Sequence, residues 1–113
     1  MATPFELRAH ARYARKVDVR VTVDGQELRG RTRDMSLGGM HAELPGLAAE
    51  VKAGSEVQLA FRVQPLRDEV RVPATVRWVQ RDAGGVVGVG LRFAGLGRVQ
   101  QWGLNKFFTQ EPS

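Results

Sequence analysis

The 113-residue sequence contains no cysteine, which excludes disulfides, zinc–thiolate sites and cysteine nucleophiles. Its two histidines, His10 and His41, have no partner at metal-ligand spacing, so a catalytic metal site is not expected. No apolar run is long enough to cross a bilayer. The N-terminal segment also lacks the apolar core of a secretory signal, and we therefore expect a cytoplasmic location.

Lysine is scarce as well. Of the 17 basic residues only Lys16, Lys52 and Lys106 are lysines, and the others are arginines. The planar fork of arginine binds a carboxylate, a phosphate or a guanine edge through two hydrogen bonds at once. The formal charge of +5 therefore suggests an anionic partner, which could be a nucleotide, a nucleic acid or an acidic protein surface.

Apolar residues that alternate with polar ones predict a mainly β domain. Val17, Val19, Val21 and Val23 follow this period of two, which is typical of a half-buried strand. The next two residues, Asp24-Gly25, predict a tight hairpin. Further strands are expected over residues 27–34, 40–44, 56–63, 70–80 and 86–93. Within the segment 70–80, Pro73 indicates an edge position or a bulge.

Two other segments flank these strands. Residues 1–16 are basic and have little to bury, which predicts a mobile arm, with a solvated tail or a short capping helix as the alternative. Residues 96–108 carry large apolar side chains at roughly helical intervals, which predicts a helix that plugs the open end of a barrel. Gly88 and Gly90 are expected to let their strand bend. The sequence thus predicts an arm at 1–16 and a small antiparallel six-stranded β-barrel with a C-terminal helix at 17–113.

The segment 33–40, RDMSLGGM, separates two of the expected strands and carries several polar groups. Asp34 and Ser36 are two residues apart, so they point to the same side of an extended backbone. Gly38 and Gly39 allow positive φ and leave room for a ligand or another backbone. The segment could bind a ligand, but the same residues are also ordinary turn chemistry.

An upstream pair of arginines favours the ligand. Arg8 and Arg12 form an RxxxR pair, and the order RxxxR, strand, hairpin, DxSxxG, strand resembles the PilZ family of bacterial cyclic di-GMP receptors. The resemblance covers essentially the whole chain, including the glycine-containing strand at 86–93. It implies a PilZ-like barrel that binds cyclic di-GMP, needs no cofactor and performs no catalysis.

The resemblance also implies roles for individual residues. Arg8 and Arg12 match arginines that swing onto the ligand and contact its phosphates and the O6 and N7 atoms of guanine. Asp34 and Ser36 match the positions that bind guanine and a nearby phosphate from the barrel surface. A carboxylate is suited to accept the N1 and N2 hydrogens of guanine, which adenine does not present as a pair. Gly39 matches the motif glycine, where a side chain would crowd the base.

The remaining candidates rest on weaker matches. Arg15 and Arg33 are secondary phosphate candidates, with solvated positions as the alternative, and Gly38 belongs to the same open backbone as the motif glycine. Trp78 matches a tryptophan that some members place near the ligand, although core packing is the commoner fate of a strand tryptophan. Leu7 stands where many members have another arginine and hold a stacked pair of ligands, so one ligand per chain is expected.

We therefore expect an effector that binds cyclic di-GMP, draws its arm over the barrel and is read by a downstream protein partner. No nucleophile–base arrangement or paired carboxylate site indicates an enzyme. Two alternatives stay open. A small basic β-barrel could bind nucleic acid, although the sequence lacks an interleaved aromatic face. A PilZ-like structural adaptor would carry the motif without binding a nucleotide.

Overall fold

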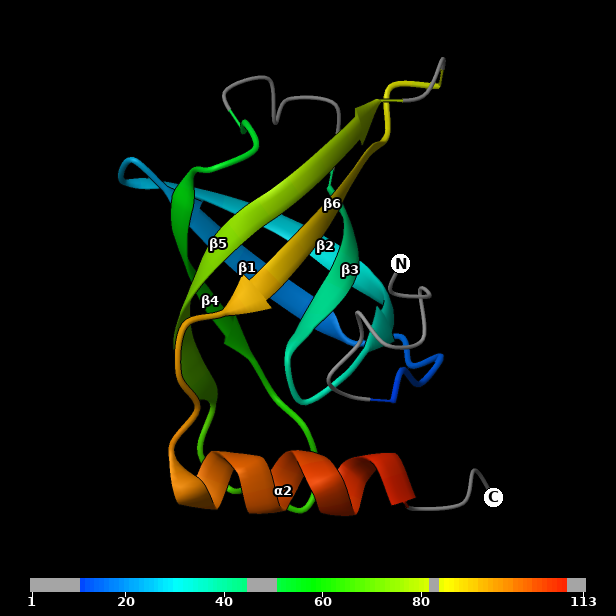
Figure 1. The fold of residues 1–113 in the computed structure, drawn as a ribbon, viewed down its shortest axis with the longest axis vertical. Helices are drawn as coiled ribbons and strands as arrows, with labels where there is room; N and C mark the ends of the chain where they lie inside the picture. Colours follow the sequence, from blue (N-terminus) through cyan, green and yellow to red (C-terminus); the bar gives the residue numbers. More distant parts are fainter. Residues whose placement is uncertain (1–10, 45–50, 82–83, 110–113) are drawn as a thin grey trace, which may run out of the picture.

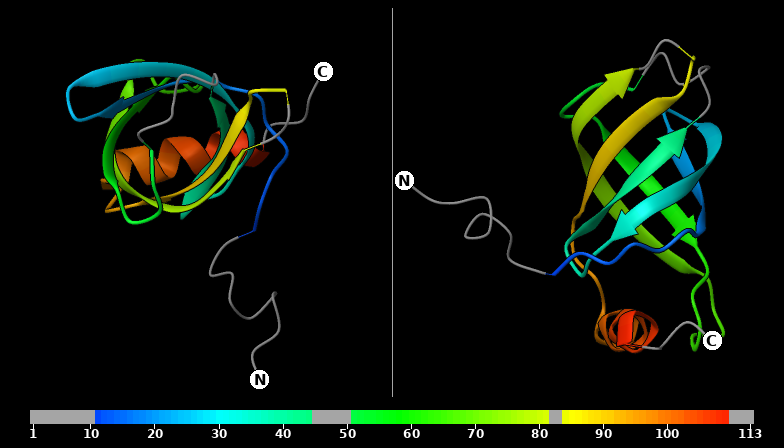
Figure 2. Two further views of the ribbon diagram at one scale, coloured as in Figure 1. Left: turned by 90° about the horizontal axis from the view of Figure 1, so that it is seen from above. Right: turned by 90° about the vertical axis from the view of Figure 1, so that its right-hand side faces the viewer.

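The computed structural model describes residues 11–44, 51–81 and 84–109. Within them, six strands close into a barrel in the order β1-β2-β3-β6-β5-β4, with every neighbouring pair antiparallel. The elements are β1 (Asp18–Val23), β2 (Gln26–Met35), β3 (Gly39–Leu44), β4 (Glu56–Phe61), β5 (Val70–Arg81), β6 (Val87–Phe93) and α2 (Arg98–Thr109). The helix α2 lies across one end of the barrel (Figure 1 and Figure 2). The predicted six-stranded antiparallel barrel with a C-terminal helix is confirmed.

The first hairpin forms where the sequence predicts it. Val19, Val21 and Val23 of β1 point into the barrel and are 1%, 0% and 6% exposed, so their alternation reflects burial of one face. Asp24 and Gly25 have φ of 49° and 81°. Positive φ at both central residues is what a type I′ turn requires, and this turn matches the twist of the two strands that it joins.

The irregularity in β5 does not lie at its proline. The bulge falls between Val76 and Trp78, whereas Pro73 is paired with Gln58 of β4. On its other side, β5 begins its ladder with β6 only at Ala74. Pro73 therefore lies just beyond that ladder, where its carbonyl accepts from the N–H of Ala94 at 2.8 Å and its missing N–H gives no return bond.

The helix closes the barrel with one face only. Leu104 and Phe108 are 0% and 3% exposed and belong to the core. Trp102 and Val99 lie on the other side and are 54% and 70% exposed. The predicted plug is thus confirmed for Leu104 and Phe108 and wrong for Val99 and Trp102, which belong to the same predicted set of apolar side chains. No helix in the described segments combines the length and apolar character that a membrane crossing needs.

Residues 11–17 run along the end of the barrel that faces α2 (Figure 2). The backbone of Tyr13 exchanges two hydrogen bonds with Met35 of β2, with N···O distances of 2.8 and 2.9 Å. Thr32 adds a side-chain link, because its hydroxyl donates to the carbonyl of Arg15 at 2.6 Å and accepts from the N–H of Val17 at 2.8 Å. This part of the predicted arm is therefore docked on β2.

Candidate functional site

The turn between β2 and β3 is built around Ser36. Its Oγ accepts hydrogen bonds from the N–H groups of Gly38 and Gly39, both at 3.1 Å, and its own N–H donates to the Gly39 carbonyl at 2.8 Å. The side chain is buried, with 4% of the residue exposed. Ser36 therefore fixes the backbone of the DxSxxG turn, and its hydroxyl is already engaged within that turn.

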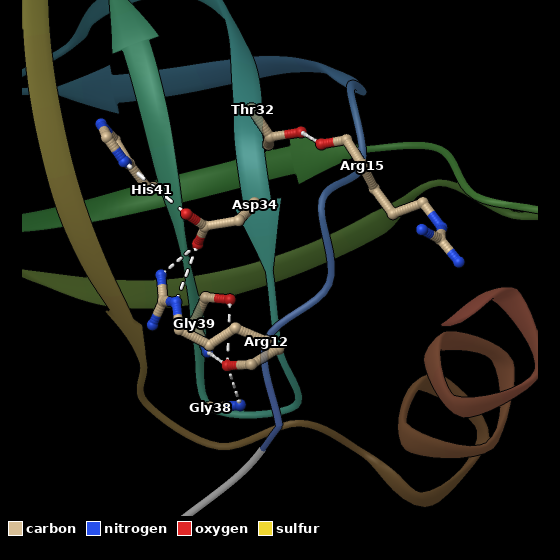
Figure 3. Close-up of polar contacts among 8 residues, drawn as sticks. Arg12, Arg15, Thr32, Asp34, Gly38, Gly39 and His41 are labelled. Atoms are coloured by element: carbon tan, nitrogen blue, oxygen red, sulfur yellow. Dashed lines mark hydrogen bonds and ion pairs between the residues drawn. The ribbon is translucent and has the colours of Figure 1, made fainter. Parts of the chain in front are cut away.

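Asp34 lies at the end of β2, where it joins an arginine and a histidine. The β2–β3 register shifts between Thr32 and Asp34, and such a bulge re-aims the side chains that follow it. One carboxylate oxygen, Oδ1, accepts hydrogen bonds from Nε and Nη2 of Arg12, the former at 2.9 Å. The other oxygen, Oδ2, lies 3.8 Å from Nδ1 of His41 (Figure 3). The two separated motifs, RxxxR and DxSxxG, thus meet through Arg12 and Asp34.

The position of Arg12 is set by its neighbours in the chain. The ring of Tyr13 stacks on Phe108 of α2, with 4.7 Å between ring centroids. Arg15 points the other way from Arg12 (Figure 3). It donates to the Phe108 carbonyl at 3.0 Å. The segment is therefore held between the DxSxxG turn and the C-terminal part of α2. Arg15 acts as a link to the helix and does not face Asp34.

A row of cross-strand partners extends from Asp34 across the outer surface of the barrel. Asp34 is paired with His41 of β3, His41 with Gly90 of β6, and Gly90 with Trp78 of β5. The bulge after Val76 turns Trp78 to the outside, where it is 40% exposed. Its ring meets His41 edge-on, with 4.8 Å between centroids. A strict period of two would have sent Trp78 into the core.

Gly90 is required by this tryptophan. A Cβ added at Gly90 would lie 2.1 Å from Nε1 of the Trp78 indole, which is far inside contact distance. A Cβ at Gly88 would lie 3.2 Å from Nε2 of His41 and 3.7 Å from the Trp78 ring. The expectation that these glycines serve barrel curvature is therefore incomplete, because at Gly90 the missing side chain makes room for the indole.

A groove of about 570 Å³ lies beside this row. Its volume falls in the range of about 300–1,000 Å³ that is usual for small-molecule sites. The described lining residues are Arg12, Ser36, Leu37, Gly38, Gly39, Met40, Arg77, Trp78, Gly90, Leu91, Arg92, Phe93, Gly95, Leu96 and Gln101. They include three arginines and no carboxylate, although Asp34 stands next to the groove through its bond to Arg12. The groove is therefore suited to an anionic ligand.

A larger hollow of about 1240 Å³, lined mainly by residues of β1, β2, β3 and β4, is a weaker candidate. Three of its four arginines are paired with acids, since Arg20 is bound to Glu69, Arg29 lies 3.1 Å from Glu27 and Arg31 lies 3.3 Å from Asp18. Paired charges leave little field for an anion. We therefore place the candidate site at the groove that contains Arg12 and the DxSxxG turn.

The predicted site residues separate into three groups. Arg12, Ser36, Gly38, Gly39 and Trp78 line the groove, and Asp34 contacts Arg12 at its edge. Arg15 and Arg33 are not among the described residues that line it. Leu7 and Arg8 lie outside the described residues, so their predicted roles stay predictions.

Sequence reasoning missed Arg77 and Arg92. Arg77 lies at the β5 bulge, and Arg92 of β6 is paired with Gly39 of β3. Their only signal in the sequence is the abundance of arginine, because their proximity depends on β6 lying between β3 and β5.

The protonation of His41, which belongs to this row, should make the stability of the protein depend on pH. Burial lowers the pKa of His41 from its ordinary value of 6.5, and the attraction of Asp34 offsets this only in part. Just below pH 6.5 the unfolded chain therefore binds more protons at this residue than the folded one. We expect its contribution to the free energy of unfolding to fall as the pH drops below 6.5. Urea denaturation of wild type and His41→Gln across this window checks this, and an equal pH dependence in both proteins would contradict it.

The sequence model of the PilZ domain matches residues 6–109. The chain therefore belongs to the PilZ domain family, and the resemblance drawn from the two motifs is confirmed. No curated protein sequence matches the chain significantly.

Several solved structures share the fold, and two of them are PilZ domains. MotI/DgrA, the inhibitor of motility of Bacillus subtilis, superposes with a TM-score of 0.72 at 18% identity over 89% of this chain and 47% of that one. The PilZ domain of Escherichia coli YcgR with c-di-GMP gives 0.69 at 20% identity over 89% of this chain and 88% of that domain. The CeSA PilZ domain from a cellulose-synthesizing bacterium gives 0.62 at 17% identity over 87% and 94%. This chain thus spans about half the length of MotI/DgrA.

Proposed function

We propose that this chain is a receptor for cyclic di-GMP that binds the dinucleotide in the groove beside the DxSxxG turn. The observation that carries the proposal is the contact of Arg12 with Asp34 at the edge of a groove lined by arginines and, among its described residues, by no carboxylate. Membership of the PilZ family adds support, as does the similar fold of the YcgR domain, whose structure contains c-di-GMP.

The Arg12–Asp34 pair keeps donors and an acceptor for a guanine base. Two N–H groups of Arg12 are used on Oδ1 of Asp34, and a guanidinium has five. The other N–H groups suit the O6 and N7 atoms of guanine or a phosphate oxygen. Oδ2 of Asp34, with its 3.8 Å contact to His41, suits the N1 and N2 hydrogens of the base. Arg12 and Asp34 can therefore both bind a guanine base while their ion pair stays intact.

Trp78 supplies an aromatic surface in the groove. The indole is 40% exposed, and its place is set by Gly90 on one side and His41 on the other. A purine stacked on such a ring gains about 1–3 kcal/mol. Trp78 is the exposed aromatic ring among the described lining residues, whereas Phe93 is buried. One exposed ring suits one base of a dinucleotide better than a run of bases, which favours a cyclic dinucleotide over a nucleic acid strand.

The arm is the element through which we propose that binding is signalled to a protein partner. Arg12 lines the groove, and within three residues Tyr13 and Arg15 both contact Phe108 of α2. A ligand that moves Arg12 would therefore act on two contacts with the helix. This linkage supports a change of arm conformation on binding that alters the surface around α2.

Isothermal titration of the protein with cyclic di-GMP tests the proposed function. We expect saturable binding with one ligand per chain, because Leu7 replaces the arginine that would favour a second one. A single-stranded oligonucleotide serves as the control for general attraction of anions to a basic protein. Absence of heat with cyclic di-GMP, or equal binding of the oligonucleotide, would refute the proposal.

Asp34 is expected to set the preference for guanine. Asp34→Ala removes the acceptor for the N1 and N2 hydrogens, which cyclic di-AMP does not present in this pattern. The variant should bind cyclic di-GMP more weakly, and its preference for cyclic di-GMP over cyclic di-AMP should narrow by about tenfold. Competition titration of both dinucleotides measures the ratio. An unchanged ratio of the two affinities would mean that Asp34 contacts Arg12 but does not recognise guanine.

A further inference from the structure

Arg77 and Arg92 reach the groove from two neighbouring strands. Arg77 follows Val76 at the β5 bulge, which leaves both Arg77 and the residue after it on the outer surface. Arg92 of β6 is paired with Thr75 of β5 on one side and with Gly39 of β3 on the other. Both side chains line the groove, and both residues are exposed.

Neither guanidinium has a hydrogen bond or ion pair with another described residue. This sets the two apart from the arginines of the barrel surface that pair with acids. Arg20, Arg31 and Arg71 each contact a carboxylate, and so does Arg12 within the groove itself. Arg77 and Arg92 are therefore the cations of the groove that no described carboxylate neutralises.

We propose that Arg77 and Arg92 are the phosphate-binding pair of this groove and hold the two phosphodiesters of one cyclic dinucleotide. The charges match among the described lining residues, because Asp34 neutralises Arg12 and leaves the positive charges of Arg77 and Arg92 for the two negative charges of the ligand. Arginine forks bind phosphate oxygens through paired, charge-assisted hydrogen bonds. The inference rests on the proposed function and assigns the phosphates to residues outside the RxxxR and DxSxxG motifs.

The test compares cyclic di-GMP affinity in wild type, Arg77→Ala, Arg92→Ala and Arg29→Ala at about 50 and 200 mM NaCl. Arg29 is the matched control, since its side chain is 82% exposed, pairs with Glu27 and does not line the groove. Arg77→Ala and Arg92→Ala should each bind about 10- to 100-fold more weakly than wild type. Their affinity should also depend less on salt, because a phosphate contact has been removed. Arg29→Ala should match wild type in both properties.

A lysine variant separates charge from shape. Arg92→Lys keeps the positive charge but loses the fork, so it should recover part of the affinity that Arg92→Ala loses and restore most of the salt dependence. If either alanine variant bound with wild-type affinity, the assignment of Arg77 and Arg92 to the phosphates would be wrong, while the proposed function would stand. The same holds if binding were weaker but its salt dependence were unchanged. A wild-type protein that fails to bind cyclic di-GMP would overturn both.

Discussion

The Arg12→Ala variant is expected to bind cyclic di-GMP about 30- to 1,000-fold more weakly than the wild-type protein, which corresponds to a loss of roughly 2–4 kcal/mol. Two effects act in the same direction. The variant loses a charge-assisted donor at the groove, and it uncovers the Asp34 carboxylate, which Arg12 now neutralises. An unpaired negative charge beside a dianionic ligand adds repulsion to the lost contact.

Isothermal titration measures the loss, and far-UV circular dichroism should show an unchanged fold. Arg12→Lys is the informative companion, because lysine keeps the charge but cannot place two N–H groups on one carboxylate oxygen in the same way. Its affinity should lie between those of wild type and alanine variant. An Arg12→Ala protein that binds within about threefold of wild type would contradict the role of the RxxxR motif.

The second large effect is on stability. In Gly39→Ala the new Cβ would lie 1.9 Å from the Leu91 carbonyl oxygen and 3.1 Å from Cα of Arg92, both of which belong to the β6 backbone. A strand backbone yields less easily than a side chain, so the β3–β6 ladder would have to shift. We expect the free energy of unfolding to fall by about 3 kcal/mol. The midpoint of thermal unfolding should fall by about 10–20 °C.

Gly97→Ala is the matched control for this substitution. A Cβ at Gly97 would have Oε1 of Gln100, at 3.7 Å, as its nearest neighbour, which is ordinary contact. Its stability should stay within about 1 kcal/mol of wild type, because Gly97 caps α2 and alanine is a poorer cap than glycine. Calorimetry without ligand decides between two roles for the motif glycine. Equal stability of both variants would mean that Gly39 is needed only for the ligand, whereas the expected loss means that the barrel itself requires it.

The strand pattern of this barrel could be predicted because it depends on local alternation. Val19 and Val21 are inward because one face of β1 is buried, and Asp24-Gly25 form the turn that their conformational preferences favour. The order of the strands could not be read in this way. β6 lies between β3 and β5, and this pairing brings together residues more than 50 positions apart in the sequence, such as Gly39 and Arg92.

The part of the candidate site that short sequence motifs supply could be predicted. Arg12 and Asp34 were expected to act together, and the structure brings them into contact. Trp78 and Arg77 depend instead on a bulge, which is a property of the pairing of two strands and leaves no clear trace in one of them. Ser36 illustrates a different limit, because a hydroxyl in a turn motif can bind a ligand or its own loop, and here it bonds its loop.

The most direct test of the central claim is a ¹H–¹⁵N NMR titration of the wild-type protein with cyclic di-GMP. We predict shifts for the Trp78 indole N–H, for the amides of Ser36–Gly39 and Arg92, and for the arm contact at Tyr13. The exposed indole of Trp102 is the internal control, because it does not line the groove and should move little. Binding in this groove would be contradicted if saturating ligand left the Trp78 and Ser36–Gly39 signals unmoved. It would also be contradicted if the ligand shifted the signals of the outer residues of β1 and β4 instead.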